Sequence, residues 1–247
     1  MEVEKGPVWP KARGHEWYHC INEFFPKDLG FTHTFADHSI YIYQHGTSTT
    51  IIPLYVDNLL IGYNDGDAML HIKTALKCRF KMVDVGPASW VLGMCVLHDL
   101  QKGMMNLNQS LYIWNVVEKF GMADCKPVAT PLPEKLMLTS ATDDEVLEAH
   151  SFLYLQAIGS VMYAMLGTRP DIMYAVSTLS CFSSQPGPKH VQALKHLLCY
   201  LKGSADFGIV YSCDGGTLHG SKSERMLSEC DSLVGFTNSD YAMDPES

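Results

Sequence analysis

The chain has 247 residues, of which 47% are apolar and 18% charged, and its formal net charge is −9. This composition is typical of a globular protein with one or two domains. The acidic balance weighs against a large nonspecific nucleic-acid surface, because such surfaces are rich in Lys and Arg.

The acidic excess is concentrated after residue 205, where two basic residues face eight acidic ones, so the rest of the chain is close to neutral. The longest apolar stretch, residues 51–61, is far shorter than the roughly 20 residues of a membrane span. Residues 1–13 lack the apolar core of a signal peptide. We therefore expect an intracellular protein, in the cytoplasm or nucleus, that has no membrane partner.

The eight cysteines are scattered and contain no CxxC pair. This pattern predicts neither a disulfide framework nor a structural zinc site. The thiols are expected to be ordinary buried or half-buried groups.

The first half of the chain predicts a mixture of helices and strands. Residues 15–31 have apolar side chains at helical spacing and then stop signals, and residues 39–44 have the composition of a strand. Two apolar runs, 51–56 and 59–64, flank Asp57-Asn58, which is the pattern of a β-hairpin with its turn at that pair. A helix is expected from Asp65, a candidate N-cap.

The second half is expected to be mostly helical. Its predicted elements are strands at 89–98 and 104–108, a helix at 110–120 ending at Gly121, a linker at 126–150, a helix at 151–166, a helix with Pro170 in its first turn that runs to 183, a helix with a leucine stripe through 191–201 that ends before Gly203, and strands at 206–211 and 233–241.

The hairpin could be no more than a turn, but its context indicates more. Tyr55-Val56-Asp57-Asn58 lies within IIPLYVDNLLIGYNDGD, which resembles the YVDD segment of Ty1/copia-type reverse transcriptases. Other segments resemble the same family, in the family's order: KARGHEWYHCINEFF, LGFTHTFADHSIYIYQ, FKMVDVGPASWVLGM, KFGMADCKPVATPL, AIGSVMYAMLGTRPDIMYAVSTLSCF, HVQALKHLLCYLKGSADFGIVY and LVGFTNSDYAMDP.

The resemblance implies an α+β fold with three regions. Residues 1–107 would form a partial polymerase palm, an antiparallel sheet with the hairpin and packed helices. Residues 108–205 would form a helical thumb and connection region. Residues 206–247 would be the truncated start of an RNase H-like domain.

The resemblance also implies a metal-dependent RNA-directed DNA polymerase. In this family, three aspartates hold two Mg²⁺ (or Mn²⁺) ions, one aspartate from an earlier strand and two from the YVDD pair. Asp57 matches the first of the pair, Asn58 replaces the second, and the earlier strand has no counterpart in the sequence. An amide oxygen can bind a hard cation but brings no charge. We therefore expect Asp57 to be the remaining catalytic and metal-binding residue, in a polymerase that is defective.

An RNA/DNA template-primer is the partner that the family implies. The residues expected to contact it are Tyr55, Leu92, Gly93, Met94, Lys73, Arg79 and Lys195, and further lysines lie nearby at Lys77, Lys81, Lys189 and Lys202. A solvated polar face would explain the basic residues equally well.

Several positions depart from the family and weaken this expectation. Ala12 and His15 stand where Gln and Arg are usual, and Leu155 and Cys181 stand where basic residues are frequent. Asn238 takes the place of the first RNase H aspartate, although Asp240 lies nearby.

Two other hypotheses remain open. The chain could be a host-retained fragment that binds nucleic acid or an unknown protein partner without chemistry. It could also be a genomic relic that does not fold stably, because a palm without all its strands would expose sheet edges. The agreement among helix caps, leucine stripe and hairpin weighs against the relic.

Overall fold

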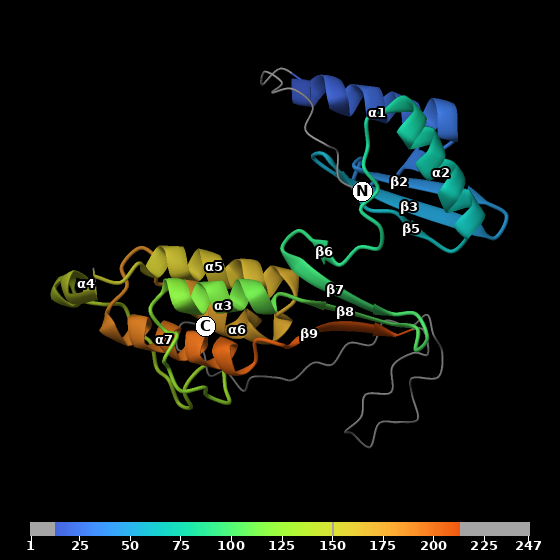
Figure 1. Ribbon diagram of the computed structural model, residues 1–247. Helices are drawn as coiled ribbons and strands as arrows, with labels where there is room; N and C mark the ends of the chain where they lie inside the picture. Colours follow the sequence, from blue (N-terminus) through green and yellow to red (C-terminus); the bar gives the residue numbers. More distant parts are fainter. Residues whose placement is uncertain (1–12, 150, 213–247) are drawn as a thin grey trace. The chain divides into compact units, whose positions relative to one another are not determined.

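The computed structural model describes residues 13–149 and 151–212, and these residues divide into two compact units between Ala88 and Ser89 (Figure 1). Both units combine helices with an antiparallel sheet, which confirms the predicted α+β class. The strand predicted at 233–241, together with Ala12, Asn238 and Asp240, lies outside the described residues. No helix among the described residues is long and apolar enough to cross a bilayer.

The first unit is a five-stranded antiparallel sheet with two helices. Its elements are α1 (Arg13–Leu29), β1 (Thr32–His33), β2 (Ile40–His45), β3 (Ser48–Tyr55), β4 (Asn58–Leu59), β5 (Gly62–Tyr63) and α2 (Gly66–Arg79). The long strand β3 pairs with β2 along one edge, and with β4 and then β5 along the other. The predicted helices and the 39–44 strand are confirmed.

The side chains of β3 point alternately to the inner and the outer face of the sheet. Thr50, Ile52 and Leu54 are buried, whereas Ile51 and Tyr55 are exposed. The inner face packs against both helices, and the core that results consists of Ile21, Phe24, Phe25, Phe31, Tyr41, Ile52, Leu54, Leu59, Ile72, Leu76 and Met82.

The predicted N-cap of α2 is confirmed in detail. The Asp65 carboxylate accepts hydrogen bonds from the backbone N–H groups of Asp67 and Ala68, at 3.0 and 3.3 Å. These bonds lower the pKa of Asp65 below its ordinary value, because they favour the charged form. The cap fixes the start of α2 directly after the hairpin.

The second unit combines a four-stranded antiparallel sheet with a bundle of helices (Figure 1). Its strands are β6 (Trp90–Val91), β7 (Met94–Asp99), β8 (Met104–Asn108) and β9 (Gly208–Ser212), in the order β6-β7-β8-β9. Its helices are α3 (Ser110–Lys119), α4 (Asp143–Ala149), α5 (Tyr154–Gly167), the 3-10 turn η1 (Pro170–Ile172), α6 (Met173–Ser180) and α7 (Pro188–Gly203).

The core of this unit lies among the helices. The predicted leucine stripe of α7 is confirmed: Leu194, Leu197, Leu198 and Leu201 are all buried in it. Four predictions need adjustment. The single strand predicted at 89–98 is the hairpin of β6 and β7, with its turn at Leu92 and Gly93. The expected linker contains the helix α4, the predicted helix after Pro170 begins with the turn η1, and Gly203 is the last residue of α7 instead of following it.

The compact units do not follow the predicted boundaries at 107 and 205. Strand β9 pairs with β8 in register from Met104↔Ser212 to Asn108↔Gly208, so residues predicted for the palm and for the RNase H-like start share one sheet. The names palm, thumb and RNase H for these regions stay predictions.

Candidate active site and nucleic-acid surface

The hairpin turn that carries Asp57 lies at the end of the longest strand of the first unit. Tyr55 pairs with Asn58 and Leu54 with Leu59, so Val56 and Asp57 form a two-residue turn. The predicted hairpin is confirmed, but its turn is one residue earlier than the Asp57-Asn58 pair. Asp57 and Asn58 are both exposed, and the tip therefore presents one carboxylate and one amide to solvent.

The backbone of Val56 is strained, because its φ is 53°. A β-branched side chain rarely adopts this left-handed region. Such a residue costs about 1–3 kcal/mol and persists only where its surroundings hold it in place. The strain therefore implies that contacts around the turn stabilise its shape.

Two sets of contacts hold the turn. The indole Nε1 of Trp17 in α1 donates a hydrogen bond of 3.0 Å to the carbonyl oxygen of Val56. The Trp17 ring packs edge-on against Phe80 at 5.2 Å, and Phe24 packs in the same way on Phe80. At the base of the hairpin, Leu54 and Leu59 are buried. The position of Asp57 is thus defined from both α1 and the core.

The described residues do not by themselves fit a two-metal centre. Mg²⁺ is held by carboxylates and other oxygen ligands in an octahedral arrangement. Among residues 13–149 and 151–212, no group of three or more His, Cys, Asp or Glu side chains could hold a metal ion. Of the two polar residues at the hairpin tip, only Asp57 carries charge.

Two basic residues of the first unit, Lys73 and Arg79, were expected to contact nucleic acid. Lys73 forms an ion pair with Asp84. Lys73 Nζ lies 3.2 Å from Asp84 Oδ2, and Lys77 Nζ lies 3.6 Å from the same atom. The backbone N–H of Gly86 and then Lys73 lower the pKa of Asp84 below its ordinary value, in spite of partial burial. Arg79 is exposed beside the Phe80 ring and forms no ion pair within the described chain. Arg79 is therefore the better candidate for a phosphate contact.

Leu92, Gly93 and Met94 lie in the second unit, at the tight turn between β6 and β7. Leu92 and Gly93 have φ values of 51° and 73°. The Tyr163 hydroxyl of α5 donates a hydrogen bond of 2.6 Å to the Leu92 carbonyl. A Cβ at position 93 would come within 3.3 Å of the same hydroxyl. The turn is therefore held against α5, with the Leu92 side chain 44% exposed.

The lysines of α7 differ in role. Lys202 donates hydrogen bonds to the carbonyl oxygens of Ala123 and Cys125, so it holds the loop after α3. Lys195 is exposed and lies 5.3 Å from the centre of the Phe152 ring. Lys195 thus remains available for a phosphate contact, whereas Lys202 has a structural role.

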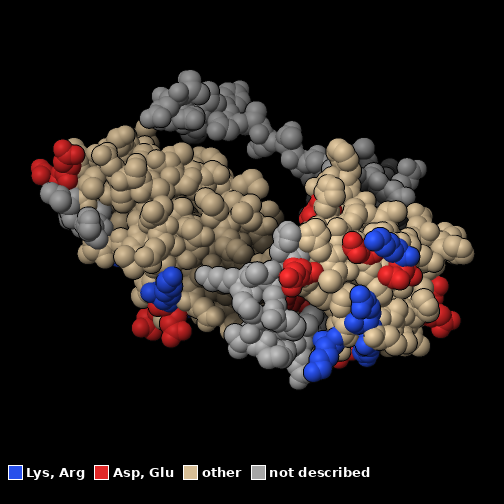
Figure 2. All heavy atoms as spheres, turned by 90° about the horizontal axis from the view of Figure 1, so that it is seen from above, with Lys and Arg blue, Asp and Glu red and all other residues tan. Residues whose placement is uncertain are grey.

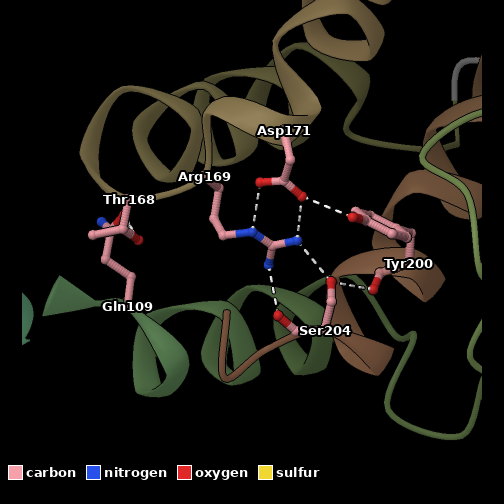
Figure 3. A network of polar contacts seen from close by, with 6 residues as sticks. All are labelled: Gln109, Thr168, Arg169, Asp171, Tyr200 and Ser204. Carbon is pink, nitrogen blue, oxygen red and sulfur yellow. Dashed lines mark hydrogen bonds and ion pairs between the residues drawn. The ribbon is translucent and has the colours of Figure 1, made fainter. Parts of the chain in front are cut away.

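Sequence reasoning missed a buried polar network in the second unit (Figure 3). The fully buried Arg169 makes a bidentate pair with Asp171, at 2.9 and 2.7 Å, and donates two hydrogen bonds to Ser204. Tyr200 donates to the same Asp171 carboxylate at 2.8 Å. The network ties η1 to the end of α7. The sequence does contain one sign of this network. Arg169 and Asp171 are the only Lys, Arg, Asp or Glu residues in the sequence from 151 to 185.

Figure 3 also shows a second contact beside this network. The Thr168 hydroxyl donates to Gln109 Oε1 at 3.0 Å, and both residues are buried. This contact joins the end of α5 to the start of α3. The Arg169 network and the Thr168–Gln109 hydrogen bond therefore both stabilise the fold of the second unit.

A family profile described as "Reverse transcriptase (RNA-dependent DNA polymerase)" matches residues 8–134. The chain belongs to this reverse transcriptase family. The predicted resemblance to the Ty1/copia type is confirmed by relatives that are Pol polyproteins of transposons.

The Retrovirus-related Pol polyprotein from transposon TNT 1-94 of Nicotiana tabacum is 33% identical over 232 residues, which are 92% of this chain and 17% of the polyprotein. The Retrovirus-related Pol polyprotein from transposon RE1 of Arabidopsis thaliana is 30% identical over 236 residues, 96% of this chain and 15% of the polyprotein. An uncharacterized mitochondrial protein of Arabidopsis thaliana is 31% identical over 156 residues, 63% of this chain and 62% of that protein. The reverse transcriptase chain thus spans about a sixth of the length of these two polyproteins. No solved structure matches it.

Proposed function

We propose that this reverse transcriptase chain is defective in DNA polymerisation. The observation that carries the proposal is the hairpin tip, where Asn58 stands beside Asp57 in the place of the second YVDD aspartate. The two metal ions of such polymerases have to be neutralised by several carboxylates while they activate the primer hydroxyl and the leaving group. With an amide at position 58, the tip offers one negative charge fewer for that work.

The test is primer extension on poly-rA/oligo-dT, with Mg²⁺ and separately with Mn²⁺. The wild-type chain is compared with Asn58→Asp, which restores the family's pair, and with Asp57→Ala, which removes the last carboxylate of the tip. We expect no extension by the wild type. Extension by the wild type that Asp57→Ala abolishes would refute the proposal.

The Asn58→Asp variant adds a second comparison. If it extends the primer and the wild type does not, the amide is the cause of the defect. If neither extends, the defect has further causes. Far-UV circular dichroism of all three proteins shows whether each is folded.

A non-catalytic nucleic-acid-binding function is the second candidate, and the exposed cations favour it. Arg79 and Lys195 form no ion pair within the described chain, unlike Lys73. The proposed ligand is an RNA/DNA template-primer, and the proposed location is the cytoplasm or nucleus. The regions at 1–107, 108–205 and 206–247 would then act as palm, thumb with connection, and RNase H-like start. An unknown protein partner is the remaining possibility within this candidate.

Fluorescence anisotropy with a labelled RNA/DNA hybrid tests this candidate at several salt concentrations. Each phosphate contact contributes a slope of roughly 0.7–0.9 in the dependence of log affinity on log salt. Arg79→Ala and Lys195→Ala should each reduce the slope, and the ion-paired Lys73 provides the control variant Lys73→Ala. Equal slopes for all variants would count against binding at these residues.

A further inference from the structure

The loop that follows α3 lies against the second half of α7. Near the end of this helix, Lys202 Nζ donates a hydrogen bond of 2.8 Å to the carbonyl oxygen of Cys125. Two turns earlier, His196 Nε2 lies 3.0 Å from the carbonyl oxygen of Thr130. The two contacts hold the loop along one side of α7.

Cys199 lies between these contacts on the same side of the helix. Residues three or four apart are neighbours on a helix surface, and Cys199 is three residues after His196 and four before Gly203. At Gly203 the loop is close again, because a Cβ built there would come within 2.8 Å of Pro127 Cβ. The loop therefore passes Cys199 between two points of contact with α7.

The thiol of Cys125 turns inward, toward that of Cys199. Cys125 is half-buried, whereas the residues on either side of it, Asp124 and Lys126, are exposed. Its backbone N–H donates to the Met122 carbonyl oxygen at 3.1 Å, which fixes the direction of the side chain together with the Lys202 contact. The two thiols are close enough to share a hydrogen bond. Both are free and half-buried, so they form a pair of reduced thiols within reach of small solutes.

A pair of neighbouring cysteines can bind a metal ion or be oxidised. Zinc sites in proteins use three or four protein ligands. Within residues 13–149 and 151–212, no group of three or more His, Cys, Asp or Glu side chains could hold a metal ion. Oxidation is therefore the chemistry that this pair supports.

We propose that Cys125 and Cys199 are a site of reversible oxidation, at which a low-molecular-weight disulfide such as oxidised glutathione links the loop to α7. Cys125 loses its proton and attacks one sulfur of glutathione disulfide, which forms a mixed disulfide and releases one glutathione. Cys199 then loses its proton and attacks the Cys125 sulfur, so the protein disulfide forms and the second glutathione leaves. Two protein thiols are oxidised, and the two glutathione thiols formed take up the two protons.

The order of the two attacks follows from the surroundings of Cys199. Burial, and then the neighbouring Cys125 thiol, raise the pKa of Cys199 above its ordinary value. The thiolate is the attacking form of a cysteine, so Cys199 reacts slowly with a disulfide in solution. Cys125 is therefore the first to react, and Cys199 resolves the mixed disulfide. The site does not depend on whether the chain polymerises DNA.

The disulfide should stabilise the second unit. A bond between residues 125 and 199 closes a long loop that contains α4, α5, α6 and most of α7. Cross-links that close long loops restrict the unfolded chain most. The thermal unfolding midpoint of the oxidised chain should therefore lie above that of the reduced chain, and dithiothreitol should reverse the difference.

The test is a titration of the full chain with buffers of reduced and oxidised glutathione, followed by alkylation of free thiols and peptide mass spectrometry. We expect the peptides that contain Cys125 and Cys199 to become joined, with the loss of two hydrogen atoms. Figure 2 looks down on the side of the second unit where Figure 1 draws α5, and this side is a broad area without Lys, Arg, Asp or Glu. Because little charge keeps copies of the chain apart there, the protein is held at low micromolar concentration to limit disulfides between copies.

Three serine variants test the pair and the order of attack. Cys199→Ser should accumulate the mixed disulfide of Cys125 with glutathione. In Cys125→Ser, Cys199 should be modified at least about tenfold more slowly, because only its small thiolate fraction reacts. The matched control is Cys95→Ser, at a half-buried cysteine of β7. It should form the 125–199 disulfide as the wild type does, with the same rise in the unfolding midpoint.

Two results with the wild type would overturn the site, and neither depends on whether a variant folds. One is the absence of a 125–199 disulfide at every ratio of oxidised to reduced glutathione. The other is a 125–199 disulfide that forms only when denaturant is present, because the two thiols would then not meet in the folded chain. Equal rates of modification in Cys125→Ser and Cys199→Ser would overturn the order of attack.

Discussion

Trp17 and Val56 are 39 residues apart in sequence, and the indole of one donates its hydrogen bond to the backbone carbonyl of the other at 3.0 Å. The bond connects α1 to the turn that presents Asp57. The hydrogen bond from Trp17 and the positive φ of Val56 both affect the stability of this turn. The first two predictions measure these two contributions one at a time.

Replacing Trp17 with Phe should loosen the turn. The variant keeps an aromatic ring against Phe80 but loses the N–H donor. We expect the free energy of unfolding of the first unit to fall by about 0.5–1.5 kcal/mol, the net value of one hydrogen bond. Chemical denaturation measures this loss, and amide exchange at residues 55–58 should accelerate. Trp114→Phe, at an exposed tryptophan of α3, is the control, and an equal effect there would contradict the prediction.

Replacing Val56 with Asn should stabilise the same unit. Asn tolerates a positive φ far better than a β-branched residue, and Val56 is 70% exposed, so little burial is lost. We expect a gain of about 0.5–1 kcal/mol in the free energy of unfolding. The control is Val85→Asn, where φ is not positive and the side chain is 60% exposed. A loss of stability in Val56→Asn would mean that the valine side chain has an unrecognised contact.

Replacing Arg169 with Met should destabilise the second unit strongly. The substitution leaves Asp171 and Ser204 without their main partner in a largely buried place. Breaking a buried pair from one side costs about 3–5 kcal/mol. Arg169→Lys should recover little of this, because an ammonium cannot make the bidentate contact. Thermal unfolding measures both, with the exposed Lys195→Met as the control. A small change in Arg169→Met would show that the network contributes little.

The same network predicts a pH dependence of stability. Burial would raise the pKa of Asp171, but the hydrogen bonds from Arg169 and Tyr200 outweigh it, so the pKa lies below its ordinary value. A lowered carboxyl pKa stabilises the folded state above the ordinary value, and that contribution is lost as the pH falls through the folded pKa. The free energy of unfolding should therefore fall with pH below about 4. In Asp171→Asn this part of the dependence should be missing, and an unchanged pH profile would contradict the assignment.

Two glycines of α5 form a matched pair. A Cβ at Gly167 would lie 2.8 Å from Gln109 Cδ, whereas one at Gly159 meets no atom within 4 Å. Gly167→Ala should cost about 1–3 kcal/mol through overpacking. Gly159→Ala should add about 0.5–1 kcal/mol through helix propensity. Thermal unfolding of both variants is compared with that of the wild-type chain. Equal effects of the two alanines would mean that Gln109 moves aside.

The elements that the sequence predicted correctly are those that depend on residues close together along the chain. The cap at Asp65, the buried stripe of α7 and the two apolar runs of the hairpin each depend on spacing within a few residues. The turn was placed one residue late, because Asp-Asn is a favourable turn pair and Val56 is an unfavourable one. Local preference was overruled there by the pairing of Leu54 with Leu59, which keeps both in the core.

The features that sequence missed depend on residues far apart along the chain. Ser204 completes the shell of Arg169 from 35 residues away, and Trp17 reaches Val56 across 39. Family resemblance identified Asp57 and its altered neighbour, since those lie inside a contiguous motif. It could not distinguish Lys73 from Arg79, which forms no ion pair within residues 13–149 and 151–212. The partner of Lys73 is set by the path of the chain to Asp84.

The pairing of β8 with β9 also constrains the order in which the chain can fold during synthesis. Strand β8, residues 104–108, can pair with β9 only after residues 208–212 have been synthesised. This sheet therefore cannot be completed until about a hundred further residues have left the ribosome. The first unit, whose strands all lie within residues 32–63, needs no such delay. On a ribosome paused within α7, the first unit should already resist proteolysis while β8 still presents an open edge.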